Sequence, residues 1–170
     1  LKLNFEHCDI PQLVDKTYRR FLPLIREKNI DATLSVCDAG LMAYVDQECF
    51  TKIISNLLGN AVKYCASRIS ILIESAPDNT FSVIISNDGN IISKNLRSRI
   101  FEPFFRVENH QQTAQTGTGI GLALARNLAE LHKGTLTMDE DGHLNVFRLT
   151  LPLNQTDYIP LSAESGLTNM

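Results

Sequence analysis

Two asparagines and a lysine accompany the most regular apolar pattern in the chain. Asn56, Asn60 and Lys63 are spaced by three or four residues, so in a helix their side chains lie along one edge. Amide oxygens are suitable ligands for a hard cation, and a lysine is a suitable contact for phosphate. Asparagine is a poor helix former, so two of them one turn apart are unusual on a solvated face. Taken alone, the segment fits either a metal–phosphate site or a surface helix.

A glycine-rich segment, QTGTGIGLALAR, is a second candidate for phosphate binding. Gly117, Gly119 and Gly121 lead directly into an apolar helical pattern, where free backbone N–H groups and the helix dipole attract anions. The spacing matches neither a Walker loop nor the Rossmann fingerprint. Such a turn also occurs where it only begins a helix, so its place at the end of a long loop is what favours a functional role.

Two shorter segments complete the candidates. Residues 86–90, SNDGN, follow a predicted strand and on their own are typical of an Asn-Asp-Gly turn. Residues 100–106, IFEPFFR, place three phenylalanines beside Arg106. The aromatic rings suit packing, and the arginine is then either solvated or available to clamp a phosphate.

The elements that must position these residues follow from apolar periodicity. Residues 46–64 predict a helix with Asp46 as its N-cap, and residues 119–133 predict a second helix that ends at Gly134. The other expected elements are a helix from Asp9 to Lys28 and strands at 2–8, 30–37, 68–74, 80–86, 135–139 and 145–151. The pattern predicts an α+β fold, a two-layer sandwich of a sheet and three helices.

The loop between these elements and the end of the chain set the expected domain limits. Residues 87–118 carry at most a short helix near residues 93–99, and a loop of this length in a compact domain is typically functional, often a lid. From residue 154 the chain is polar with isolated apolar residues. We therefore expect one domain over residues 1–153 and a tail or linker over residues 154–170.

Composition argues against several classes of function. The formal net charge is −3 over 170 residues with no basic run, which argues against binding of nucleic acid. No apolar stretch approaches the roughly 20 residues that cross a bilayer, so this segment is expected to make no membrane contact. The four cysteines include no close pair, which argues against a zinc site.

Together the four segments resemble the ATP-binding catalytic domain of sensor histidine kinases, within the wider group that includes DNA gyrase B, Hsp90 and MutL. The likeness consists of an N box, ISNLLGNAVKY, a first glycine box, SNDGNII, an F box, IFEPFFR, and a second glycine box, GTGIGLALAR, in this order. The ending ALARNLAELHKGTL is especially similar to that of hybrid two-component kinases, in which a receiver domain follows. The resemblance implies a Bergerat-type fold with a mixed sheet and a long ATP lid, and it favours the metal–phosphate interpretation of the helix.

The resemblance also implies ATP and Mg²⁺ as cofactors and a role for each candidate residue. Asn60 would ligate Mg²⁺ with Asn56 beside it, and Asn87 would read the adenine amino group. Lys63 and Arg106 would contact the phosphates. The other implied nucleotide-binding residues are Tyr64, Gly89, Gly117, Thr118, Gly119, Ile120, Gly121 and Leu122.

Two features depart from the pattern of this family. Its first glycine box reads D-x-G-x-G, whereas here Asn87 replaces the acid and Ile91 replaces the second glycine. An asparagine oxygen accepts a hydrogen bond without carrying a charge, which lowers adenine affinity by about 1–2 kcal/mol. The phosphoacceptor of the family is a His followed by Glu or Asp, whereas His7 is followed by Cys8. No catalytic residue is therefore expected, because the phosphoacceptor histidine is absent.

The resemblance implies that the domain binds Mg-ATP and donates the γ-phosphoryl group to a histidine. That histidine would lie on a helical-hairpin domain of the same protein, with a receiver domain as a further partner, in a cytoplasmic part of a membrane-anchored parent. One alternative is a water-using ATPase of the gyrase, MutL or chaperone kind, which would need a glutamate where Asn56 stands. The other is a degenerate nucleotide-binding or interaction module, an interpretation kept open by Asn87 and Ile91.

Overall fold

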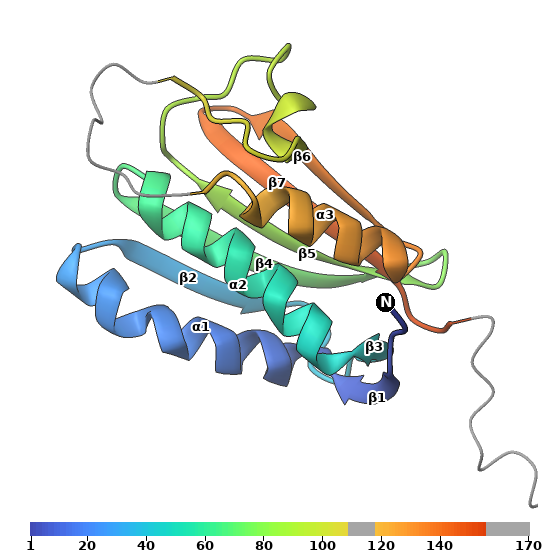
Figure 1. Ribbon diagram of the computed structural model, residues 1–170. Helices are drawn as coiled ribbons and strands as arrows, with labels where there is room; N and C mark the ends of the chain where they lie inside the picture. Colours follow the sequence, from blue (N-terminus) through green and yellow to red (C-terminus); the bar gives the residue numbers. More distant parts are fainter. Residues whose placement is uncertain (109–117, 156–170) are drawn as a thin grey trace, which may run out of the picture.

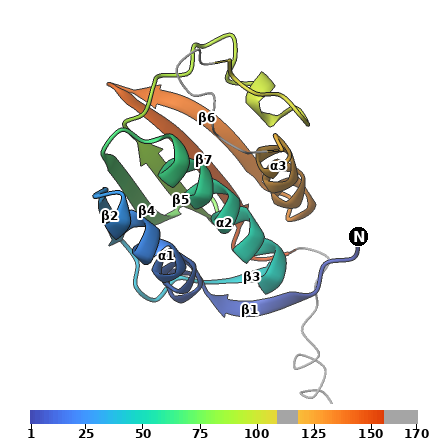
Figure 2. The same cartoon turned by 60° about the vertical axis from the view of Figure 1, so that its left-hand side comes forward.

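A layer of helices covers one face of a five-stranded sheet in the computed structural model, which describes residues 1–108 and 118–155 (Figures 1 and 2). The helices are α1 (Ile10–Glu27), α2 (Gln47–Tyr64) and α3 (Gly121–Leu131). The predicted two-layer α+β sandwich with three helices is confirmed. Within the described residues, no helix is both long enough and apolar enough to cross a membrane.

The main sheet has the strand order β2-β4-β5-β7-β6. Its strands are β2 (Asp31–Val36), β4 (Arg68–Ala76), β5 (Thr80–Asn87), β6 (Thr135–Asp141) and β7 (Leu144–Pro152). Strand β2 runs parallel to β4 and the other neighbours are antiparallel, so the sheet is mixed as expected. Because β5 is the central strand, the lid segment that begins after Asn87 leaves from the middle of the sheet (Figure 1).

A second, two-stranded sheet precedes α2, and the sequence pattern missed one of its strands. β1 (Phe5–Asp9) pairs antiparallel with β3 (Met42–Asp46). The segment MAYVD is short and runs directly into the helix with no turn residues between them. Its sequence therefore does not mark it as a separate strand. Ala43 and Val45 are buried, so β3 does show the alternation of a strand with one packed face.

Helix α2 forms the centre of the core. Its start agrees with the prediction, because the Asp46 carboxylate accepts a hydrogen bond from the Cys49 N–H at 2.9 Å. The stripe that faces the sheet is buried and consists of Phe50, Ile53, Ile54, Leu57, Leu58, Ala61 and Val62. Burial of one such large side chain contributes about 1.5–3 kcal/mol. The stripe fixes the rotation of the helix and leaves the edge with Asn56 and Asn60 only half-buried.

Several boundaries differ from those expected. The short helix expected near residues 93–99 is a 3-10 helix, η1 (Arg99–Phe101), held by the buried side chains of Ile100 and Phe101. Gln155, two residues past the expected end of the domain, is buried, and its Nε2 donates to the His132 carbonyl at 2.9 Å. Most of the expected tail, residues 156–170, lies outside the described residues.

The side chain of His132 joins the end of α3 to the start of α2. The ring is fully buried, its Nδ1 lies 2.7 Å from the Leu128 carbonyl oxygen, and its Nε2 lies 3.1 Å from the Asp46 backbone nitrogen. A carbonyl requires a donor and an N–H requires an acceptor, so the ring is neutral with its proton on Nδ1. Burial lowers the pKa of His132 below its ordinary value, against the opposing effects of Leu128 and Asp46.

The free energy of unfolding is expected to decrease as the pH falls below about 6.5, because the unfolded chain protonates His132 more readily than the folded domain does. The decrease from this group is at most about 1.4 kcal/mol per pH unit and ends at the pKa of the folded state. Urea unfolding at a series of pH values measures it. His132→Gln should lose this slope, whereas His143→Gln, at an exposed position, should keep it. An undiminished slope in His132→Gln would refute the assignment.

Candidate functional site

The amides of Asn56 and Asn60 lie one turn apart on α2 and are half-buried. Within residues 1–108 and 118–155, neither side chain makes a hydrogen bond to another protein group. A primary amide offers two donors and an acceptor, and leaving these unmatched in a partly desolvated place costs free energy. Water or a ligand must therefore supply their partners.

The last turn of α2 combines a positive charge with an exposed aromatic ring. Lys63 Nζ lies 5.1 Å from the centroid of the Tyr64 ring, a cation–π arrangement. Tyr64 is 45 % exposed although it belongs to the helix at the centre of the core. An exposed ring next to a cation suits a ligand that carries both a flat base and phosphates.

The start of α3 lies against Asn56. Ile120 occupies the N-cap position and its side chain makes no capping hydrogen bond, so the positive end of the helix dipole remains available to an anion. A methyl group on Gly121 would lie 2.8 Å from Asn56 Oδ1, so the start of α3 and the Asn56 side chain are close neighbours. The two segments that were predicted to bind phosphate therefore meet in space.

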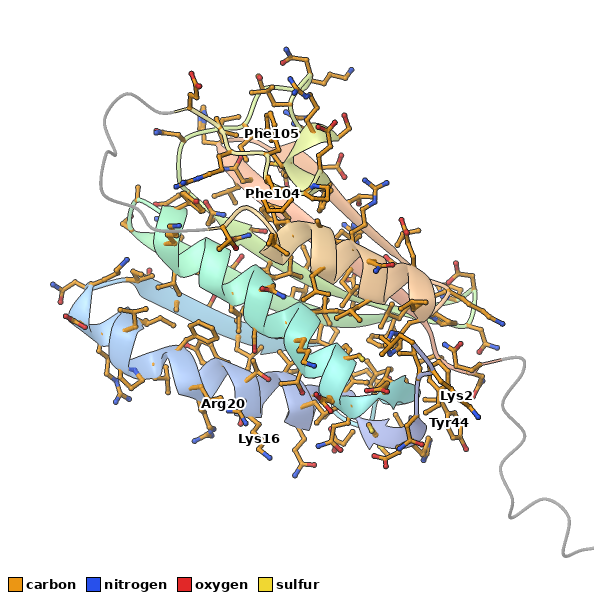
Figure 3. The ribbon with its side chains drawn as sticks, viewed as in Figure 1. Lys2, Lys16, Arg20, Tyr44, Phe104 and Phe105 are labelled. Carbon is orange, nitrogen blue, oxygen red and sulfur yellow. The ribbon has the colours of Figure 1, made fainter. Side chains whose placement is uncertain are left out.

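The middle of the lid is also in contact with the segment that leads into α3. The Phe104 N–H donates to the Gly119 carbonyl at 2.9 Å, and both residues have positive φ, 66° and 72°. A positive φ is uncommon for a bulky side chain, and the hydrogen bond to Gly119 holds it in place. The Phe104 side chain is 72 % exposed, and Figure 3 labels it with Phe105 on the segment next to α3.

The turn after β5 packs against the end of α2. Asn87 is only 3 % exposed, and its Oδ1 accepts a hydrogen bond from the Gly89 N–H at 3.0 Å. The Asn87 Nδ2 has no acceptor among the described residues. A methyl group on Gly89 would lie 2.1 Å from the Tyr64 carbonyl oxygen, so this glycine permits the close approach. The Asn87 Oδ1 is therefore hydrogen bonded within its own turn, whereas the Nδ2 remains available to a ligand.

Asp88 holds the loop that joins α2 to β4. Its carboxylate accepts hydrogen bonds from the N–H groups of Ala66, Ser67 and Arg68 and from the Ser67 hydroxyl, at 2.7 to 3.0 Å. Burial opposes its ionisation, but these hydrogen bonds outweigh that effect and lower the pKa of Asp88 to about 2. The Asp88 carboxylate therefore makes its hydrogen bonds within the protein and holds this loop. This role could not be predicted from the sequence, because SNDGN has the composition of an ordinary turn.

Most of the remaining candidates lie on the lid and at the start of α3. Thr118 is exposed, Ile120 is 41 % exposed, and Leu122 packs against the core. Arg106 is exposed on the lid segment that follows Phe105. Gly117 and residues 109–116 of the expected lid lie outside the described residues. Helix α2 thus lies against the start of α3 at Asn56 and Gly121, and against the turn after β5 at Tyr64 and Gly89.

Residues 45–155 match the model of a family described as histidine kinase-, DNA gyrase B- and HSP90-like ATPase. The chain therefore belongs to this family of ATP-binding domains, as the four sequence boxes predicted.

Curated relatives and a solved structure agree with the assignment. Sensor protein VanSC of Enterococcus gallinarum is 29% identical over 150 residues, which are 88% of this chain and 41% of that protein. Sensor histidine kinase TmoS of Ectopseudomonas mendocina is 34% identical in an alignment of 175 positions, gaps included, that covers 98% of this chain and 18% of that protein. The catalytic domain of histidine kinase ThkA superimposes with a TM-score of 0.81 at 26% identity, covering 89% of this chain and 97% of that structure. The chain thus spans less than half the length of these two sensor proteins, and its fold is that of histidine kinase catalytic domains.

Proposed function

We propose that this domain binds Mg-ATP between α2, α3 and the lid, and that it donates the γ-phosphoryl group to a histidine on another domain of its parent protein. The observation that carries the proposal is the pair of amides on Asn56 and Asn60, which have no protein partner within the described residues and lie beside the uncapped start of α3. Phosphates supply acceptors for N–H groups, and a cation bound to them supplies a partner for an amide oxygen.

The residues present fit a Mg²⁺ ion that binds together with the nucleotide. No cluster of three or more His, Cys, Asp or Glu side chains among the described residues offers a metal site made by protein alone. Magnesium commonly takes one or two protein ligands and completes its shell with phosphate oxygens and water, so Asn60 on a rigid helix is sufficient. When bound, the ion would neutralise charge on the phosphates during transfer.

The chain itself would position the nucleotide. Lys63 and the start of α3 would compensate the charge of the phosphates, while Tyr64 and Asn87 would contact the base. Transfer of a phosphoryl group depends mainly on positioning and charge neutralisation, and these residues supply both. Hydrolysis would need a base that activates water, and Asn56 cannot act as one. These features favour a kinase over an ATPase.

The phosphoacceptor domain would contact the exposed apolar side chains at the base of the lid. Phe104 is 72 % exposed. Ile120, just before α3, is 41 % exposed, and Leu124, on the first turn of α3, is 39 % exposed. Their backbones lie close together, because the Phe104 N–H donates to the Gly119 carbonyl and the Leu124 N–H donates to the Ile120 carbonyl. A receiver domain would be the next acceptor, and the parent protein would place this domain on the cytoplasmic side of a membrane.

The proposal is tested by incubating the full-length parent protein and this isolated domain separately with γ-labelled ATP. The parent should acquire a label that is labile in acid and stable in alkali, as expected for phosphohistidine, whereas the isolated domain should bind ATP and hydrolyse it very slowly. Steady hydrolysis by the domain alone, abolished by Asn60→Ala, would overturn the kinase proposal in favour of an ATPase.

Asn87→Asp is expected to raise the preference for ATP over GTP by about tenfold. One carboxylate oxygen would keep the hydrogen bond to the Gly89 N–H, and the other would replace Nδ2 by an acceptor for the 6-amino group of adenine. Guanine presents a carbonyl oxygen there, which a carboxylate repels. Competition against a fluorescent ATP analogue measures both affinities.

Asn90→Asp is the matched control, because it adds the same charge at an exposed position of the same turn. An equal change in both variants, or a large loss of ATP affinity in Asn87→Asp, would exclude Asn87 as the residue that reads the base.

A further inference from the structure

A groove of about 580 Å³ lies between α1 and α2, on the half of α2 that precedes Asn56. Of the described residues that are proposed to bind nucleotide, only Asn56 borders it. The residues that line it are Leu13, Lys16, Thr17, Arg20, Gln47, Glu48, Thr51, Lys52, Ser55 and Asn56. The groove is therefore a separate feature that adjoins the phosphate end of the nucleotide site.

The charge around the groove is positive. The lining includes three basic residues, Lys16, Arg20 and Lys52, and one acidic residue, Glu48. The Glu48 carboxylate is paired with Lys52 at 2.8 Å. Lys16 and Arg20 make no hydrogen bond or ion pair with the described part of the chain. They project from the same side of α1, one turn apart (Figure 3). Because the whole chain carries a net charge of −3, this positive surface is a local feature.

Neutral polar groups on α2 complete the lining. The side chains of Gln47, Thr51 and Ser55 also make no hydrogen bond to another described residue. Thr51 and Ser55 are half-buried and one turn apart, so both hydroxyls border the groove. Thr17 is different, since it is buried and its hydroxyl donates to the Leu13 carbonyl at 2.9 Å. The groove thus offers hydrogen-bond donors from both helices, Lys16 and Arg20 on α1 and Thr51 and Ser55 on α2.

The shape of the groove suits a segment of polypeptide. Pockets for small molecules are mostly apolar and enclosed, whereas nine of the ten residues around this groove are charged or polar by type and the groove is shared by two helix surfaces. The lining spans Leu13 to Arg20 on α1 and Gln47 to Asn56 on α2, which corresponds to ~10–14 Å of helix. That length accommodates about two turns of a helix or about four extended residues.

We propose that the groove between α1 and α2 binds an acidic segment of a protein partner. Carboxylates of the partner would pair with Lys16 and Arg20, and its other polar groups would accept hydrogen bonds from Thr51 and Ser55. Since Asn56 borders the groove, a partner bound there lies next to the phosphate end of the nucleotide site. The proposal rests on the lining of the groove and does not require that the domain be a kinase.

The test uses this domain and a fluorescent, end-capped oligo-glutamate peptide of about eight residues, the length of two helical turns. Fluorescence anisotropy at low salt should show binding that weakens as salt is added. The double variant Lys16→Gln and Arg20→Gln should weaken it at least fivefold. The matched control, Arg19→Gln and Arg26→Gln, removes two charges from the same helix outside the groove and should change affinity less than twofold.

Four results would overturn the proposal. One is that the unaltered domain does not bind the peptide. Another is that both double variants lose affinity equally, which would show a response to total charge. The third is that inorganic pyrophosphate displaces the peptide as effectively as unlabelled oligo-glutamate does, which would assign the groove to a small anion. Saturation with Mg²⁺ and a non-hydrolysable ATP analogue should leave the peptide bound, whereas its displacement would place it in the nucleotide site instead.

Discussion

Asn60→Ala is expected to abolish Mg²⁺-dependent binding of ATP without unfolding the domain. The amide of Asn60 is half-buried and makes no hydrogen bond to the described residues, so its removal breaks no hydrogen bond within that part of the chain. Alanine is also the better helix former, so α2 should be as stable or slightly more so. A ligand to the ion would be lost, and affinity for Mg-ATP should fall by about a hundredfold or more.

Asn127→Ala provides the control for this prediction, because it makes the same change at an exposed position of α3. Its affinity for Mg-ATP and its melting temperature should equal those of the unaltered domain. If Asn60→Ala retained Mg²⁺-dependent affinity, the ion would have to be held by other residues.

Gly89→Ala is expected to be the most damaging small substitution in the site. The added methyl group would lie 2.1 Å from the Tyr64 carbonyl oxygen and 2.9 Å from Asn87 Oδ1. The first of these atoms belongs to the backbone at the end of α2, so the turn or the helix end must move. We expect a loss of about 2–3 kcal/mol in the free energy of unfolding and a fall of ~6–10 °C in Tm.

Nucleotide affinity should also fall in Gly89→Ala, since Tyr64 and Asn87 both border the site proposed here. Gly40→Ala is the matched control, because its methyl group would meet only Asp38 Oδ1 at 3.7 Å, an ordinary contact. Thermal unfolding and nucleotide titration of the two variants give the comparison. Equal stability of Gly89→Ala and the unaltered domain would show that the turn packs less closely against α2 than the structure indicates.

The sequence was sufficient to predict the elements whose signals are local. The periodicity of α2 and the carboxylate of Asp46 determine the helix and its first turn without reference to the rest of the chain. The sequence did not predict strand β3, because it has only five residues and no turn residues separate it from α2. Its burial depends on pairing with β1, which is distant in the sequence. The short helix expected near residues 93–99 became turns and η1, since the buried side chains of Ile100 and Phe101 set the path of that segment.

Within the site, residue types were predictable but partners were not. The four boxes predicted Asn56, Asn60 and the glycines as site residues, and the family they indicated is the one whose model matches residues 45–155. The contact of His132 with Asp46 joins residues 86 positions apart, and no local pattern encodes it. Similarly, the pattern SNDGN does not predict that the Asp88 carboxylate is hydrogen bonded to the loop before β4. Nor does it predict that the Asn87 Nδ2 is left available to a ligand. Such roles depend on which strands and helices lie next to one another.

Calorimetric titration of this domain with a non-hydrolysable ATP analogue, with and without Mg²⁺, tests the nucleotide site most directly. We predict binding of one nucleotide per domain that is at least tenfold tighter with Mg²⁺ and that loses this dependence in Asn60→Ala. Failure to bind the analogue at millimolar concentration, or equal affinity with and without Mg²⁺, would contradict the proposal that α2, α3 and the lid form a site for Mg-ATP.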